Sequence, residues 1–216
     1  MNNLIEKIVI QNIGPYQDSW AVVYLDPNTS YSAGGGRITV ITDDYTGSAF
    51  FSHVGQPTFK KFIAQCDAPY LISKIFKTPK WVPVLDGNEF IAAIWRERSH
   101  QIKTLRKEEE FSLFSKIKLR NLYEELKDCD FESMSHLHDC LDDDHRSSLV
   151  DIFQSDDWWW ESPPAKLNHV YIYLESILSG IVSEFKKLEE RQIENLQTLC
   201  RVCNARKGTN LEKGST

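Results

Sequence analysis

Histidine, cysteine and carboxylate side chains gather in one short stretch of the chain. The stretch is His136-Leu137-His138-Asp139-Cys140, followed by Asp142, Asp143, Asp144 and His145. Imidazole, thiolate and carboxylate groups are common metal ligands, so this composition indicates a metal site. The alternative is a solvated acidic loop between helices, where such residues are abundant because they need no burial. The sequence favours the loop.

A cysteine pair later in the chain has the spacing of half a zinc site. Cys200 and Cys203 form a Cys-x-x-Cys motif, which supplies two of the four ligands of a tetrahedral zinc ion. The segment 195–208 around the pair resembles the last part of zinc-containing HNH nucleases. That resemblance implies a structural zinc bound in part by these two thiolates.

Other parts of the nuclease pattern are missing. An HNH enzyme needs a histidine general base beside a metal ligand, whereas a charged helical stretch, 185–192, precedes the motif here. There is no second Cys-x-x-Cys upstream, and the spacing does not imply that the missing ligands come from Cys129, Cys140, His136 or His138. A divergent nuclease using His136, His138 or His145 as its base, a structural zinc site and a degenerate tail all stay open, and the tail is favoured. No catalytic residue is assigned, and no cofactor is expected beyond the zinc that the pair could hold.

Negative charge is concentrated beside three consecutive tryptophans. The range 124–157 holds twelve Asp or Glu against Lys127 and Arg146. Successive side chains point in different directions, so one surface cannot easily bury all three indoles. Exposed tryptophan is common in interaction hot spots, and clustered carboxylates can imitate the field of phosphates. The predicted partner-binding residues are Asp142, Asp143, Asp144, Asp156, Asp157, Trp158, Trp159 and Trp160. The alternative is that Trp158 and Trp160 anchor this segment in the core.

Composition indicates a folded cytoplasmic chain. Of 216 residues, 41% are apolar, which is enough for a hydrophobic core. No run of about 18 apolar residues occurs, so neither a membrane segment nor an export signal is expected. Five cysteines, an odd number, suit reduced thiols. A net charge of −6 argues against direct nucleic-acid binding.

The elements that would position these groups form an α+β fold. Short β-branched and aromatic runs separated by turn residues predict an antiparallel meander of four strands, at 5–13, 20–25, 37–42 and 48–54. Two short helices after Pro57 should cover one face of the sheet. A charged helical pattern runs over 89–126, and Ser162 with Pro163 predicts the start of an amphipathic helix. The expected regions are 1–87, an insert at 88–157, a helix at 158–190 that packs back on the core, and a Cys-x-x-Cys tail at 191–216.

Several longer strings resemble a family of uncharacterised proteins from temperate phages and prophages of enterobacteria. They are Gly36-Arg37-Ile38-Thr39-Val40, Tyr45-Thr46-Gly47-Ser48-Ala49-Phe50-Phe51-Ser52-His53-Val54-Gly55, Phe62-Ile63-Ala64-Gln65-Cys66-Asp67-Ala68-Pro69-Tyr70-Leu71-Ile72 and Leu167-Asn168-His169-Val170-Tyr171-Ile172-Tyr173-Leu174. The resemblance covers 3–76 and 158–187 and implies a small accessory gene product, typically dispensable for growth and of unknown activity. Together with the cysteine usage, it makes the host cell cytoplasm the expected compartment. The insert 89–157 and the tail are not parts of that pattern.

The leading hypothesis is a phage accessory protein that binds a host protein, such as a defence or nucleic-acid-processing factor, through its acidic, tryptophan-bearing surface. The alternative from another class is the divergent HNH-like, metal-dependent nuclease. A third is a structural role in which the last long helix self-associates.

Overall fold

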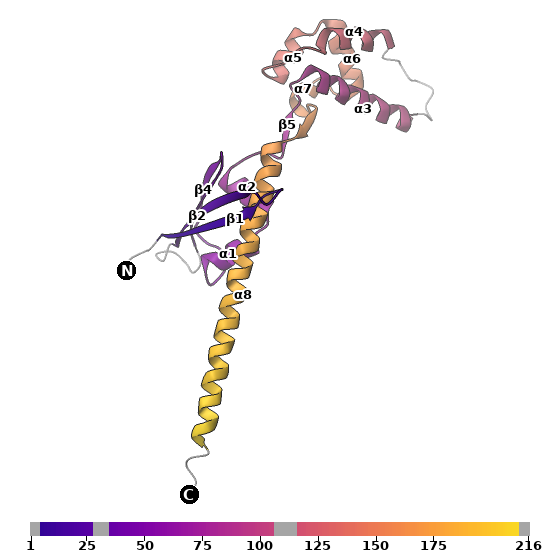
Figure 1. Cartoon of the computed structure of the whole chain (residues 1–216). Coiled ribbons are helices and arrows are strands. Elements are labelled where there is room, and N and C mark those ends of the chain that lie inside the picture. Colours follow the sequence, from indigo (N-terminus) through magenta and orange to yellow (C-terminus); the bar gives the residue numbers. More distant parts are fainter. Residues whose placement is uncertain (1–4, 28–34, 106–115, 212–216) are drawn as a thin grey trace. The chain divides into compact units, whose positions relative to one another are not determined.

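The computed structural model describes residues 5–27, 35–105 and 116–211, and it describes their side chains except at 101–105, 116–119, 192 and 195–211. The chain divides into two compact units. The sheet unit comprises Met1–Lys80 and His169–Thr216, and the helical unit comprises Trp81–Asn168. Figure 1 labels most of their elements.

The sheet unit is built on a four-stranded antiparallel meander. Its strands are β1 Glu6–Ile13, β2 Ser19–Pro27, β3 Gly36–Thr42 and β4 Thr46–Phe51, in the spatial order β1-β2-β3-β4. Inward-facing residues alternate with outward-facing ones, as the period of a strand requires. Ala21, Val23 and Leu25 of β2 are buried, whereas Val22 and Tyr24 between them are partly exposed.

Three helices pack against the sheet (Figure 1): α1 Phe59–Gln65, α2 Ala68–Ile75 and α8 His169–Leu211. Thr58 and Asp67 are the N-caps of α1 and α2. Their side-chain oxygens accept hydrogen bonds from backbone N–H groups in the first turn of each helix. The buried stripe of α8 includes Leu174, Ile177, Ile181 and Phe185. Gly180 lets α8 approach β1 closely, because a Cβ there would lie 2.7 Å from Ile13 Cγ2. The predicted α+β architecture, with helices over an antiparallel meander, is confirmed.

The helical unit has its own core. Its elements are β5 Trp81–Pro83, α3 Gly87–Leu105, α4 Lys116–Leu126, α5 Met134–Cys140, α6 Asp143–Phe153, α7 Trp158–Glu161 and β6 Ala165–Leu167. Strands β5 and β6 pair antiparallel. The core centres on Phe90, Ile94, Leu122, Leu137 and Trp158. Gly87 lies so close to α4 that an added Cβ would lie 1.7 Å from the Leu126 carbonyl oxygen.

Two local predictions were wrong. Ser162 follows α7 as its C-cap, and the residues after Pro163 pair as β6, so the long helix begins at His169 and not near Pro163. The helical pattern expected over 89–126 is confirmed in its described parts, which are α3 and α4, and 106–115 lie outside the described residues. Most of the expected acidic loop is the helices α5 and α6. Within the described part of the chain, no helix has the length and apolar character needed to span a membrane.

Candidate functional site

The acidic run at 142–144 starts helix α6. Asp142 is the N-cap, and its Oδ1 accepts the backbone N–H of His145 at 2.7 Å. Asp143 and Asp144 occupy the first turn, where carboxylates interact favourably with the positive end of the helix dipole. Helix formation therefore accounts for the position of all three carboxylates, and Asp142 is engaged within the fold.

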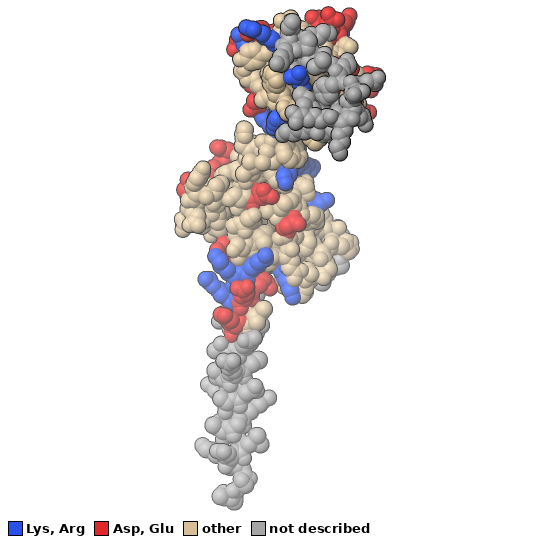
Figure 2. Space-filling view, turned by 90° about the vertical axis from the view of Figure 1, so that its right-hand side faces the viewer, with Lys and Arg blue, Asp and Glu red and all other residues tan. Residues whose placement is uncertain are grey.

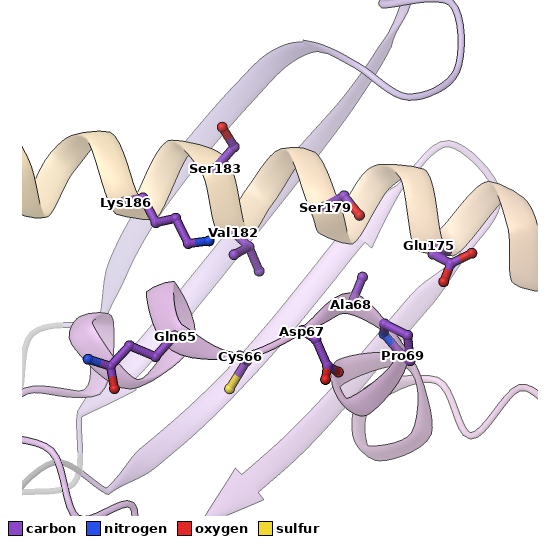
Figure 3. Close-up of a pocket in the computed structure, with 10 residues that line it drawn as sticks. All are labelled: Gln65, Cys66, Asp67, Ala68, Pro69, Glu175, Ser179, Val182, Ser183 and Lys186. Atoms are coloured by element: carbon purple, nitrogen blue, oxygen red, sulfur yellow. The ribbon is translucent and has the colours of Figure 1, made fainter.

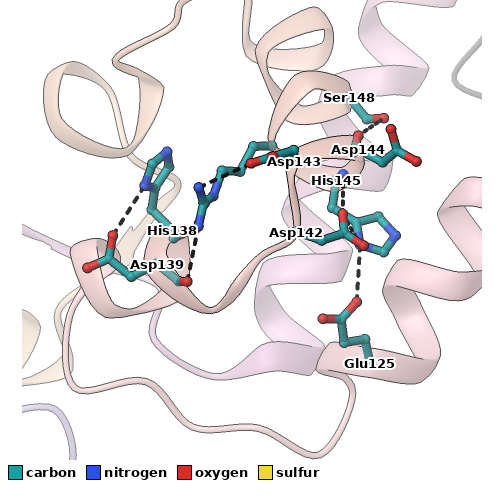
Figure 4. Close-up of polar contacts among 9 residues, drawn as sticks. Glu125, His138, Asp139, Asp142, Asp143, Asp144, His145 and Ser148 are labelled. Atoms are coloured by element: carbon teal, nitrogen blue, oxygen red, sulfur yellow. Dashed lines mark hydrogen bonds and ion pairs between the residues drawn. The ribbon is translucent and has the colours of Figure 1, made fainter.

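His145 is the buried member of the His/Asp stretch. Its Nδ1 lies 3.1 Å from Glu125 Oε2 and 3.1 Å from Asp142 Oδ1 (Figure 4). These are ion-pair distances, but neither contact has hydrogen-bond geometry. Across the side chains that the structure describes, no group of three His, Cys, Asp or Glu is placed to hold a metal.

Arg146 joins the end of α5 to the beginning of α6. Its Nε donates to the His138 carbonyl at 2.9 Å and its Nη2 donates to the Asp139 carbonyl at 3.1 Å. The last carbonyls of a helix have no partner within it, so the guanidinium satisfies groups that would otherwise need water. Nη1 also lies 3.4 Å from Asp143 Oδ1. One side chain thus ties an acidic residue of α6 to the segment that carries His138.

The three tryptophans have three different environments. Trp158 is 1% exposed and stacks on Phe153, with ring centroids 4.9 Å apart. Trp159 is half-buried and stacks on the His138 imidazole at 5.0 Å. Trp160 is 77% exposed, and its ring lies 6.3 Å from that of Trp159 in an edge-on arrangement. Trp158 therefore belongs to the core and Trp160 to the surface.

A connected set of contacts runs from the start of α6 to Trp160. Asp143 contacts Arg146, Arg146 binds the backbone of the His138 segment, and His138 stacks on Trp159 beside Trp160. We call these residues, with the exposed Asp139, Asp156 and Asp157, the tryptophan surface. Sequence reasoning missed the roles of Arg146 and His138. The available signal was that Arg146 is one of only two basic residues in the acidic range.

Charge divides unevenly between the two units. The helical unit has 19 Asp and Glu against 11 Lys and Arg, whereas the sheet unit has 12 against 14. On the face shown in Figure 2, charged side chains of the sheet unit of both signs gather next to the grey residues of α8. The acidity of the whole chain therefore resides in the helical unit.

The cysteines whose side chains the structure describes take no part in a metal site. Cys200 and Cys203 fall within the bounds of α8, but their side chains lie outside the described residues. Of the residues considered for completing a zinc shell, Cys129 donates through Sγ to the Glu125 carbonyl at 3.3 Å, and His136 meets Phe131 edge-on. A zinc at the cysteine pair stays a prediction.

The sheet unit holds a polar cavity of about 620 Å³ between α8 and the α1–α2 connection (Figure 3). Its lining includes the thiol of Cys66, the hydroxyls of Ser179 and Ser183, and the carboxylates of Asp67 and Glu175. Burial raises the pKa of the Cys66 thiol to about 11, and the Asp67 carboxylate acts in the same direction. Asp67 is engaged as the N-cap of α2. A thiol that stays protonated at neutral pH is a poor nucleophile, so its environment does not activate Cys66.

Comparison with known proteins identifies a family for this chain. The model of a protein family described as a phage family matches residues 2–187. No curated protein and no solved structure matches the chain. The match runs through 89–157, so the expectation that this insert lies outside the family pattern was wrong, and the segment from 188 onward lies beyond the match. Because most of its length is matched, the chain belongs to this phage protein family.

Proposed function

We propose that this phage protein is an accessory factor of a temperate phage that binds a host protein through the tryptophan surface, without chemical turnover. The observation that carries the proposal is Trp160, a large indole that is 77% exposed beside a second indole held in place by His138. Tryptophan is strongly enriched among residues whose truncation costs most at interfaces.

The support beneath Trp160 favours binding over an accidental exposure. Trp158 is fixed in the core, Trp159 is stacked on His138, and Arg146 fixes the backbone of that histidine. A side chain on a rigid base loses less conformational entropy when a partner covers it. Such a base is what a preorganised anchor requires.

Carboxylates around the indoles define the partner's chemistry. Asp139, Asp156 and Asp157 are exposed, and the helical unit as a whole has an excess of negative charge. Complementary charge accelerates encounter and excludes wrong partners more than it adds affinity. The partner is therefore a protein with an apolar pocket for an indole and a rim of Lys and Arg.

The test is quantitative capture from lysate of the phage's host with the tagged full chain. Trp160→Ala should remove the captured protein, and Asp156→Lys with Asp157→Lys should weaken capture and its dependence on salt. The matched controls are Trp95→Ala and Asp151→Lys, exposed positions of the same unit. Asp142 is unsuitable for charge reversal because it caps α6. Equal capture by Trp160→Ala and the unchanged chain would refute the proposal.

A further inference from the structure

The β3–β4 hairpin of the sheet unit borders a cavity of about 300 Å³ that has no part in the proposed function. We call it the hairpin cavity. Its lining residues are Asp43, Asp44, Tyr45, His169, Val170 and Tyr173. Aromatic rings and carboxylates therefore share one small space.

Two tyrosine rings form part of its wall. The rings of Tyr45 and Tyr173 lie 5.8 Å apart between centroids, with planes inclined by 45°. Tyr45 follows the hairpin turn and Tyr173 is in the second turn of α8, so two separate elements hold the pair. The face of an aromatic ring attracts cations through its quadrupole, and several rings together recognise ammonium groups.

The wall is fixed in advance by hydrogen bonds. The Tyr173 hydroxyl donates to Asp43 Oδ2 at 2.8 Å and lies 2.9 Å from the buried Thr42 Oγ1. The Thr42 hydroxyl donates to the Trp20 carbonyl oxygen at 3.1 Å. Burial raises the pKa of Tyr173, so its hydroxyl stays protonated and continues to orient the Asp43 carboxylate.

Charge and size limit the ligand. Asp43 and Asp44 form no ion pair with any side chain in the described part of the molecule. Among the described His, Cys, Asp and Glu side chains, no group of three is placed to hold a metal ion. The negative charge of the cavity therefore suits an organic cation better than a metal ion. A volume of about 300 Å³ is at the small end for ligand pockets and fits one amine or guanidinium head.

We propose that the hairpin cavity binds an organic cation, an ammonium or guanidinium group, which packs against the two tyrosine rings and lies beside the exposed carboxylates of Asp43 and Asp44. The cation could belong to a free amine or to a lysine or arginine side chain of a protein. Both sources offer the same chemistry, and the experiment separates them.

The test is NMR titration of the full chain with N-acetyl-lysine methylamide and with its neutral norleucine counterpart, following the amide signals of 42–47. The lysine compound should bind at least about fivefold more tightly than the norleucine compound, and tetramethylammonium should compete. Equal affinity of the two compounds, or no saturable shift, would overturn the proposal. A lysine-containing peptide that binds more tightly than N-acetyl-lysine methylamide indicates a protein source. A peptide that binds as tightly as N-acetyl-lysine methylamide indicates a free amine, and both results support a cation site.

Matched variants assign the effect to the cavity. Asp44→Asn and Tyr45→Leu should each lower the affinity for the lysine compound at least about threefold, whereas Tyr45→Phe should retain it because the ring remains. Asp18→Asn and Tyr16→Leu, exposed positions in the neighbouring hairpin, should leave it unchanged. Binding that is unaffected by Asp44→Asn and Tyr45→Leu, or equally weakened by the control changes, contradicts the assignment. None of these residues belongs to the tryptophan surface, so this proposal and the proposed function can fail separately.

Discussion

The imidazole of His138 stacks on the indole of Trp159, with ring centroids 5.0 Å apart and planes inclined by 29°. This contact supports Trp159, which is half-buried beside the exposed Trp160. His138→Ala should lower the free energy of unfolding of the helical unit by about 0.5–1.5 kcal/mol, since stacked aromatic pairs contribute that much beyond area burial. Urea unfolding followed by circular dichroism measures the change, with His53→Ala in the sheet unit as the control. A value indistinguishable from that of the control would show that the stack contributes nothing.

Trp158 and Trp160 should respond oppositely to the same substitution. Trp158→Ala removes a fully buried ring from the core and should destabilise the helical unit by about 3–5 kcal/mol. Trp160→Ala removes an exposed ring and should change the stability by no more than about 0.5 kcal/mol. Chemical denaturation of the two variants makes the comparison. Similar losses would mean that both indoles are structural.

Arg146→Ala should destabilise the helical unit by about 1–3 kcal/mol, because two carbonyls at the end of α5 lose their donors. Arg146→Lys should recover only part of the loss, since an ammonium lacks the planar fork that reaches both carbonyls. Arg120→Ala, at an exposed position of α4, is the control for charge removal. Full recovery in Arg146→Lys would show that charge alone matters.

Local patterns predicted the sheet unit well. The strands β1 to β4 follow the β-branched runs, and the expected stripe on the long helix contains the buried Leu174, Ile177, Ile181 and Phe185. In these elements, burial on one face imposes a period that is visible in the sequence. That signal depends on neighbours along the chain and needs no tertiary information.

Tertiary context decided where local patterns failed. Ser162 and Pro163 have the chemistry of a helix start, but pairing of β6 with β5 delays the helix to His169. The run of three tryptophans predicted that the indoles would differ in exposure. Which indole is buried depends on the rings that contact Trp158, and one of them, Phe90, is far from Trp158 in sequence. The contact of Arg146 with the end of α5 likewise depends on how two helices meet.

Cys66 should react slowly with alkylating reagents. Because burial raises the pKa of its thiol to about 11, only about one molecule in a thousand carries the thiolate at pH 8, against about a quarter for an ordinary thiol. The alkylation rate should rise about tenfold per pH unit from 7.5 to 9.5 without levelling off. Mass spectrometry of the Cys66 peptide after iodoacetamide treatment gives the rate. A plateau near pH 9 would mean that the thiol is not shielded.

Metal content tests the prediction at the cysteine pair. If Cys200 and Cys203 hold a structural zinc, the purified chain should contain about one zinc per chain or per shared site, and Cys200→Ser with Cys203→Ser should abolish it. Elemental analysis by mass spectrometry reads this directly, with Cys140→Ser as the matched control. Absence of zinc from protein purified without chelator would exclude the zinc interpretation and remove support from the nuclease alternative.

The self-association alternative has its own measurement. Sedimentation of the full chain should match that of a chain ending at Leu188 in oligomeric state, because the proposed function needs only one copy. A monomer produced solely by the truncation would favour a structural role for the end of α8.

Site-specific crosslinking tests the central claim most directly. The photoreactive residue p-benzoylphenylalanine is placed at position 160 of the full chain in infected host cells, or at position 95 as the exposed control in the same unit. Illumination should join one host protein to position 160 and not to position 95, and Asp156→Lys with Asp157→Lys should reduce the yield. The same products at both positions, or none at position 160, would contradict binding through the tryptophan surface.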